Sequence, residues 1–152
     1  MANRVSHAPV RKAPGFTEFV SMVASLMAMT ALAIDAMLPA LPAIGEALDV
    51  ASDNDRQLVI GALLIGFGFA QLVHGPLSDR FGRRPLLIGG LGLYVLSSIM
   101  AAYAQSFELL LAARCAQGVA VAATRVLAVS IVRDLYVGRK MAQVMSVAMT
   151  VF

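Results

Sequence analysis

Two side chains of opposite charge stand inside long apolar stretches, at Asp35 and Arg114. A charge at the centre of a membrane-spanning helix costs ~2.5–3.5 kcal/mol on insertion scales, so such residues usually face a cavity or a partner. Asp35 comes sixteen residues after Phe19, about 24 Å along an outward-running helix, and Arg114 comes five residues after Leu109, about 8 Å along an inward-running one. The two charges therefore fall at similar depths, and a pair would lower the cost of both. A titrating carboxyl beside a cation that can change partners is what proton coupling requires. The alternative is that Asp35 only marks the outer end of its helix and touches water.

Four further polar side chains lie within or beside the apolar stretches. Gln117 follows Arg114 by three residues, and it either hydrogen-bonds between helices or lines a polar cavity; both interpretations stay open, as they do for Gln71. We interpret Arg125 as reaching the lipid headgroups through its long stem, with a place in a cavity as the alternative. We interpret His74 as a residue of the membrane boundary rather than a proton relay.

A compact charged segment separates two of the apolar stretches. From Gly75 to Leu87 it reads Gly-Pro-Leu-Ser-Asp-Arg-Phe-Gly-Arg-Arg-Pro-Leu-Leu. Positive charge next to membrane spans stays on the cytoplasmic side, so this segment predicts a cytoplasmic hairpin between two spans.

We expect these residues to be carried by membrane-spanning helices. Hydrophobic residues make up 59% of the 152-residue chain and charged residues only 14%, against about 25% charged residues in soluble domains. Since about 20 helical residues cross a hydrocarbon core of ~30 Å, we expect an all-α membrane protein. It has a cytoplasmic tail at 1–15 and a partial transmembrane half at 16–152, with spans at about 16–42, 57–77, 85–104 and 108–132 and the start of a fifth at 141–152. The single cysteine, Cys115, leaves no disulfide framework, and no nucleophile–base group or metal-ligand spacing suggests an enzyme or a metal site.

Lysine and arginine are distributed unevenly about these spans. Nine of the twelve fall on one side, in the tail and after the second and fourth spans: Arg4, Arg11, Lys12, Arg80, Arg83, Arg84, Arg133, Arg139 and Lys140. The positive-inside rule then predicts a cytoplasmic N-terminus. The net charge of +3 follows from membrane topology, which argues against a nucleic-acid-binding face.

Three motifs resemble those of a transporter family. The hairpin resembles motif A of the major facilitator superfamily, the loop between its second and third spans: Gly75-Pro-Leu-Ser-Asp79-Arg80-Phe-Gly82-Arg83-Arg84. The superfamily's span 4 motif is similar to Arg114-Cys-Ala-Gln117-Gly118. Two further segments are similar to those of its bicyclomycin/chloramphenicol-resistance (Bcr/CflA) branch of drug:proton antiporters. They are Ile34-Asp35-Ala-Met-Leu-Pro39-Ala-Leu-Pro42 and Val132-Arg133-Asp134-Leu-Tyr.

The resemblance implies a major facilitator-type helical bundle, here its first four transmembrane helices plus the start of a fifth. It implies that Asp79 caps a helix of the second half of the molecule and that Arg83 bridges to Asp134. Asp35 and Arg114 would contribute to proton coupling. The implied gate comprises Gly75, Asp79, Arg80, Gly82, Arg83, Arg84 and Asp134, and the implied proton-coupling and substrate cavity comprises Asp35, Arg114 and Gln117. Arg80 and Arg84 also serve as topology signals.

The implied function is proton-coupled export of small amphipathic antibiotics, similar to chloramphenicol or bicyclomycin, across a bacterial inner membrane by alternating access. Its partners would be the bilayer, the drug and protons, with the proton gradient as driving force and no cofactor. The superfamily has twelve spans in two halves, so we expect this chain to be a fragment whose C-terminal half is missing. The alternatives are a sugar or metabolite carrier of the same fold and a truncated membrane protein without transport activity.

Overall fold

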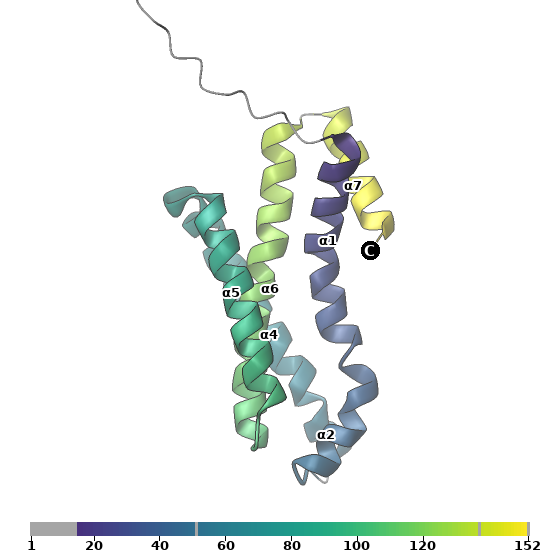
Figure 1. Cartoon of the computed structure of the whole chain (residues 1–152), viewed down its shortest axis with the longest axis vertical. Coiled ribbons are helices and arrows are strands. Elements are labelled where there is room, and N and C mark those ends of the chain that lie inside the picture. The colour runs from purple at the N-terminus through teal and green to yellow at the C-terminus, as the bar shows by residue number, and fades with distance from the viewer. Residues whose placement is uncertain (1–14, 51, 137, 152) are drawn as a thin grey trace, which may run out of the picture.

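All regular structure in the computed structural model is helical within the described residues, which are 15–50, 52–136 and 138–151. Of the expected tail at 1–15, residues 1–14 lie outside this range. The elements in chain order are α1 (Phe16–Asp35), η1 (Leu38–Ala40), α2 (Leu41–Ala47), α3 (Asp53–Arg56), α4 (Leu58–Phe81), α5 (Arg83–Ala102), α6 (Phe107–Leu135) and α7 (Arg139–Val151). They form an upright bundle in which α6 stands between α5 and α1 (Figure 1).

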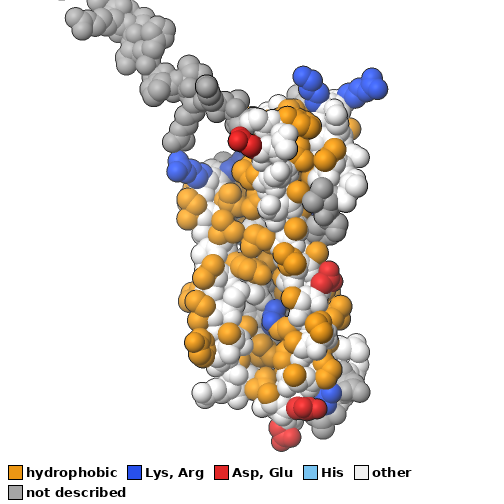
Figure 2. All heavy atoms as spheres, turned by 45° about the vertical axis from the view of Figure 1, so that its right-hand side comes forward, with side chains coloured by type: hydrophobic (Ala, Val, Ile, Leu, Met, Phe, Trp, Pro, Cys, Tyr) orange, Lys and Arg blue, Asp and Glu red, His pale blue; other side chains and the backbone are white. Residues whose placement is uncertain are grey.

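Four helical stretches of the described chain are long and apolar enough to cross a membrane: Phe16–Ala47, Asn54–Phe81, Arg83–Ala102 and Phe107–Leu135. Their exposed side chains include large apolar ones that would face lipid, such as Ile65, Phe69 and Leu72 on α4, each at least 70% exposed. Figure 2 shows charged side chains mostly at the two ends, with an apolar band between them. The expected all-α membrane bundle is confirmed.

The crossing of α4 and α6 depends on two glycines. A Cβ atom on Gly66 would overlap the backbone of Cys115, and one on Gly118 would overlap the backbone of Leu63. Small residues let membrane helices approach closely enough for backbone contact. This crossing fixes the depth of α6 relative to α4, and hence the depth of the polar side chains that α6 carries.

A separate apolar cluster joins α1, α6 and α7. Phe19, Val23 and Met27 of α1 pack with Val132 of α6 and Val144 of α7. The helix α7 therefore lies beside the first half of α1, as Figure 1 shows at the upper right. The other end of α1 is left to pack against α4 and α6.

Two boundaries differ from the expected spans. The first span is interrupted: α1 ends at Asp35, and η1 and α2 follow with Pro39 and Pro42 in their first turns, where a missing N–H costs nothing. The charged hairpin is tighter than expected, because α4 continues to Phe81 through Pro76 and α5 starts at Arg83.

The turn itself is Gly82, whose φ of +86° lies in a region that favours glycine. We call the end of the bundle near this residue the Gly82 end, and the opposite end, with η1, α2 and α3, the α2 end.

Candidate functional site

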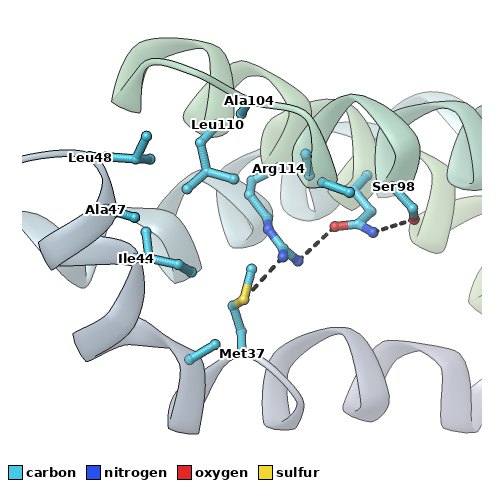
Figure 3. Close-up of a pocket in the computed structure, with 12 residues that line it drawn as sticks. Met37, Ile44, Ala47, Leu48, Ser98, Ala104, Leu110 and Arg114 are labelled. Carbon is cyan, nitrogen blue, oxygen red and sulfur yellow. Dashed lines mark hydrogen bonds between the residues drawn. The ribbon is translucent and has the colours of Figure 1, made fainter.

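A cavity of about 370 Å³ opens at the α2 end, between η1–α2 on one side and α5 and α6 on the other. Its wall is mainly apolar, with Ile44, Leu48 and Leu110 among the lining side chains, and its polar groups come from Arg114, Gln117 and Ser98. Figure 3 shows Arg114 and Ser98 on one side of the cavity, opposite the apolar side chains of α2.

A chain of hydrogen bonds crosses this wall. Nη1 of Arg114 donates to Oε1 of Gln117 (2.8 Å), and Nε2 of Gln117 donates to Oγ of Ser98 on α5 (2.7 Å). The Ser98 hydroxyl in turn donates to the carbonyl of Tyr94 (2.7 Å). Gln117 is only 4% exposed, so it fills both roles left open by the sequence: it joins two helices and it lines a cavity.

The predicted ion pair between Asp35 and Arg114 is wrong for this structure. Nη2 of Arg114 instead donates to the sulfur of Met37 (3.0 Å), a weak acceptor. The physical reason is local: Asp35 is the last residue of α1 and is exposed, and the turn that follows carries Met37 toward α6. Nε of Arg114 is buried and has no hydrogen-bond partner among the described residues. The guanidinium therefore has N–H groups that its bonds to Gln117 and Met37 do not use.

At the Gly82 end, Arg83 forms an ion pair with Asp134 and also donates from Nη1 to the carbonyl of Ser130 (2.7 Å). The contact expected between Arg83 and Asp134 is therefore present. It ties the first residue of α5 to the last turn of α6. Because both side chains are partly exposed, at 31% and 51%, the pair contributes about 0–1 kcal/mol.

The remaining motif A residues are not part of this pair. Asp79 is exposed in the last turn of α4, and Arg84 is exposed at the start of α5. The guanidinium of Arg80 lies 5.4 Å from the ring centre of Phe81. The carbonyl of Gly75 accepts the Ser78 hydroxyl (2.8 Å), which satisfies a polar group inside α4.

Three residues of the described region were not singled out from the sequence. Met37 and Ser98 contact the Arg114–Gln117 pair, and Phe67 lies under the guanidinium of Arg125. Ser98 could have been found as a hydroxyl inside an apolar span. His74, expected at the boundary, is buried with Nδ1 2.7 Å from the carbonyl of Ala70, one turn earlier in its own helix.

The fold defines a multi-pass membrane protein, a helical bundle with a partly polar cavity at its α2 end. Residues 23–152 match the family described as Major Facilitator Superfamily. The chain belongs to this superfamily, as its motifs indicated.

Several curated relatives are similar over most of this chain. A chloramphenicol resistance protein of Pseudomonas aeruginosa is 39% identical over 112 residues, which is 74% of this chain and 26% of the relative. Multidrug resistance protein D of Escherichia coli K12 is 35% identical over 115 residues, 76% of this chain and 29% of the relative. Multidrug resistance protein MdtL of Shewanella oneidensis is 36% identical over 121 residues, which is 80% of this chain and 30% of the relative. The chain thus spans between a quarter and a third of the length of these relatives.

Proposed function

We propose that this chain is part of a proton-coupled drug exporter of the bacterial inner membrane. The observation that carries the proposal is the cavity at the α2 end, in which an apolar wall faces the hydrogen-bonded Arg114 and Gln117. Sites for small molecules are mostly apolar with a few placed polar groups. This combination suits an amphipathic antibiotic, and relatives named for chloramphenicol and multidrug resistance support that substrate class.

In this proposal the cavity binds the drug, and Arg114 and Gln117 hold its polar part. Nη1 and Nη2 of Arg114 each carry a second N–H beyond those bonded to Gln117 and Met37, and these donors can bind a ligand. Asp35 is exposed at the same end of the bundle, two residues before Met37, where a carboxyl can exchange protons with water. A proton taken up or released there changes the charge at this end of the bundle and so favours one conformation over the other.

The Gly82 end holds the proposed gate. Six basic residues belong to this end: Arg80, Arg83, Arg84, Arg133, Arg139 and Lys140. Basic residues next to spans stay in the cytoplasm, so we place this end inside the cell. The Arg83–Asp134 pair then serves as a latch between α5 and α6. Asp79 is free to cap a helix elsewhere in the protein, because an anion is favoured at a helix N-terminus.

The test is drug efflux from bacteria that lack their own exporters and express the protein as its gene encodes it. We expect lower chloramphenicol accumulation than in cells with an empty vector, and loss of that difference when a protonophore dissipates the proton gradient. Efflux that survives the protonophore would disprove proton coupling. Unchanged accumulation of chloramphenicol, together with uptake of a sugar or metabolite, would favour a carrier of that kind.

A further inference from the structure

Arg114 is a cation whose partners within the described chain are neutral. Its guanidinium donates to the amide oxygen of Gln117 (2.8 Å) and to the sulfur of Met37 (3.0 Å), as the dashed lines of Figure 3 show. Asp35 is exposed and does not pair with it. A charge at membrane depth is costly unless an opposite charge or water compensates it. The described residues therefore supply hydrogen bonds to Arg114 but no counter-charge.

Arg114 lines two spaces, and only one of them has room for a ligand. The first is a narrow apolar space lined by Ile34, Val59 and Leu63, with no volume for a water molecule. The second is the cavity of about 370 Å³ at the α2 end, within the range of about 300–1,000 Å³ that is typical of sites for small molecules. A counter-charge for Arg114 would therefore arrive through this cavity.

The described residues that line the larger cavity include no acid, and Arg114 is the charged residue among them. The acids Asp49, Asp55 and Glu108 of the same end line a neighbouring cavity, which shares only Leu48 with the first. The wall around Arg114 thus carries positive charge, which favours an anion and disfavours a cation.

The second cation inside α6, Arg125, has an aromatic partner and lines neither of the two spaces beside Arg114. Its guanidinium carbon is 5.9 Å from the ring centre of Phe67 on α4, within the range of a cation–π contact. A Cβ atom on Gly118 would lie 2.8 Å from the backbone nitrogen of Phe67, and Gly118 precedes Arg125 by seven residues, about 10 Å along α6. Arg125 must therefore extend away from the Gly82 end, and the interpretation that it reaches the headgroups there is wrong.

The contact with Met37 is one that a ligand can replace. A thioether sulfur is a weak acceptor, and a guanidinium has five N–H groups, of which Gln117 and Met37 use two. Bonds between arginine and a carboxylate are roughly twice as strong as bonds between neutral groups. A carboxylate can therefore bind Arg114 through its remaining N–H groups, or in place of Met37, while Gln117 keeps its bond to Ser98.

We propose that this cavity selects amphipathic carboxylates, with the oxyanion bound to Arg114 and the apolar body against Ile44 and Leu48 of α2. The inference rests on the proposed export function and names the charge class of its preferred substrate. A cation of the same shape is repelled by Arg114 and meets no acid among the described lining residues, so it is discriminated against.

The test uses three fluorescent probes that share one naphthalene ring and differ in charge: 2-naphthoate, 2-naphthylmethanol and 2-naphthylmethylammonium. Their binding is measured in detergent, with the protein as its gene encodes it. We expect 2-naphthoate to bind at least about ten-fold more tightly than the ammonium probe, because a hydrogen bond to a charged group is worth about 1.5–3 kcal/mol. The neutral alcohol should lie between them.

Two variants test whether Arg114 carries the preference. Arg114→Gln should weaken binding of 2-naphthoate at least about ten-fold and change binding of the alcohol by less than about three-fold. Met37→Glu places a carboxylate where the sulfur now accepts from Nη2, so it should compete with 2-naphthoate and weaken its binding to a similar degree. Met37→Leu is the matched control without a charge, and Arg133→Gln is the control for anion binding at the Gly82 end. Both should leave binding of 2-naphthoate unchanged.

Other outcomes would overturn the proposal. These are equal affinity for the three probes, tighter binding of the cation, equal loss of all probes in Arg114→Gln, and loss of 2-naphthoate binding in Arg133→Gln. If Arg114→Gln fails to insert, the comparison of Met37→Glu with Met37→Leu decides, and equal binding of 2-naphthoate by the two disproves the proposal. If the unmodified protein exports no chloramphenicol, the proposed function fails, and binding of the three probes in detergent still decides the charge preference of the cavity.

Discussion

The two ends of the bundle hold their arginines in different ways. At the α2 end, Arg114 has neutral partners, and its hydrogen bonds continue through the buried Gln117 to Ser98. At the Gly82 end, Arg83 meets the carboxylate of Asp134, and both side chains are partly exposed. A buried polar group left without its partner costs about 1–3 kcal/mol, whereas an exposed ion pair contributes about 0–1 kcal/mol. The first arrangement is therefore rigid and the second is easy to open.

This difference suits two tasks. A rigid wall holds its donors in place for a ligand with little loss of conformational entropy. A weak pair that joins two helices can break and re-form with small changes in free energy, as a gate between two conformations must. We rank four substitutions by their expected effect on the stability of the purified protein, because this order tests whether the two ends differ as described.

The largest effect is expected between the two ends, at the α4–α6 crossing. Gly118→Leu would place a side chain on the backbone of Leu63, and overpacking of this kind costs about 3 kcal/mol or more when backbone must move. We expect loss of the folded protein in detergent, measured by circular dichroism during heating. Gly68→Leu is the control, because a Cβ atom there meets nothing within 4 Å. Equal stability of the two variants would show that the crossing is not as close as described.

The next effect is expected at the α2 end, with Gln117→Leu. The change removes the acceptor of Arg114 and the donor to Ser98, so we expect a loss of about 1–3 kcal/mol. Drug export should fall at least ten-fold, because Arg114 is no longer held against the cavity wall. The control is Gln71→Leu, an exposed glutamine of α4, which should change neither quantity. A Gln117→Leu protein that is as stable as the control would mean that the buried network is not rigid.

The helices could be predicted from the sequence for a physical reason, because apolar runs of about twenty residues specify spans by themselves. The contact between Arg83 and Asp134 was predicted only through the resemblance to the superfamily's motifs, because the two residues lie far apart in the chain. Asp35 shows where this fails. Its depth was predicted from helix rise, but its direction depends on the break at Pro39 and Pro42, which brings Met37 to Arg114 instead.

The direction of a long side chain was equally hidden from the sequence. Arg125 has a basic boundary nearby, and only the register of α4 against α6, fixed by Gly118, shows that it points away from that boundary. Register between helices depends on packing between segments about fifty residues apart, so no local pattern encodes it.

A smaller effect is expected from breaking the latch. Arg83→Met removes the ion pair and the bond to Ser130, and we expect about 1 kcal/mol or less of lost stability. Asp134→Asn should cost a similar amount, and the double variant should cost less than the sum because the two share one interaction. The coupling should weaken further in high salt. Lys140→Met, an exposed cation of α7, is the control, and strict additivity of the two changes would mean that no pair forms in solution.

The smallest effect on stability is expected from Asp35→Asn, and this variant separates stability from function most sharply. Asp35 is exposed and has no ion pair with Arg114, so its neutralisation should change the unfolding free energy by less than about 0.5 kcal/mol. Drug-induced proton release, measured with a pH indicator in detergent, should nevertheless be lost, because the side chain can no longer take up or release a proton. Glu46→Gln on α2, exposed at the same end, should leave proton release intact. Normal proton release in Asp35→Asn would exclude Asp35 from coupling and would leave the α2 end as a binding wall without a proton site.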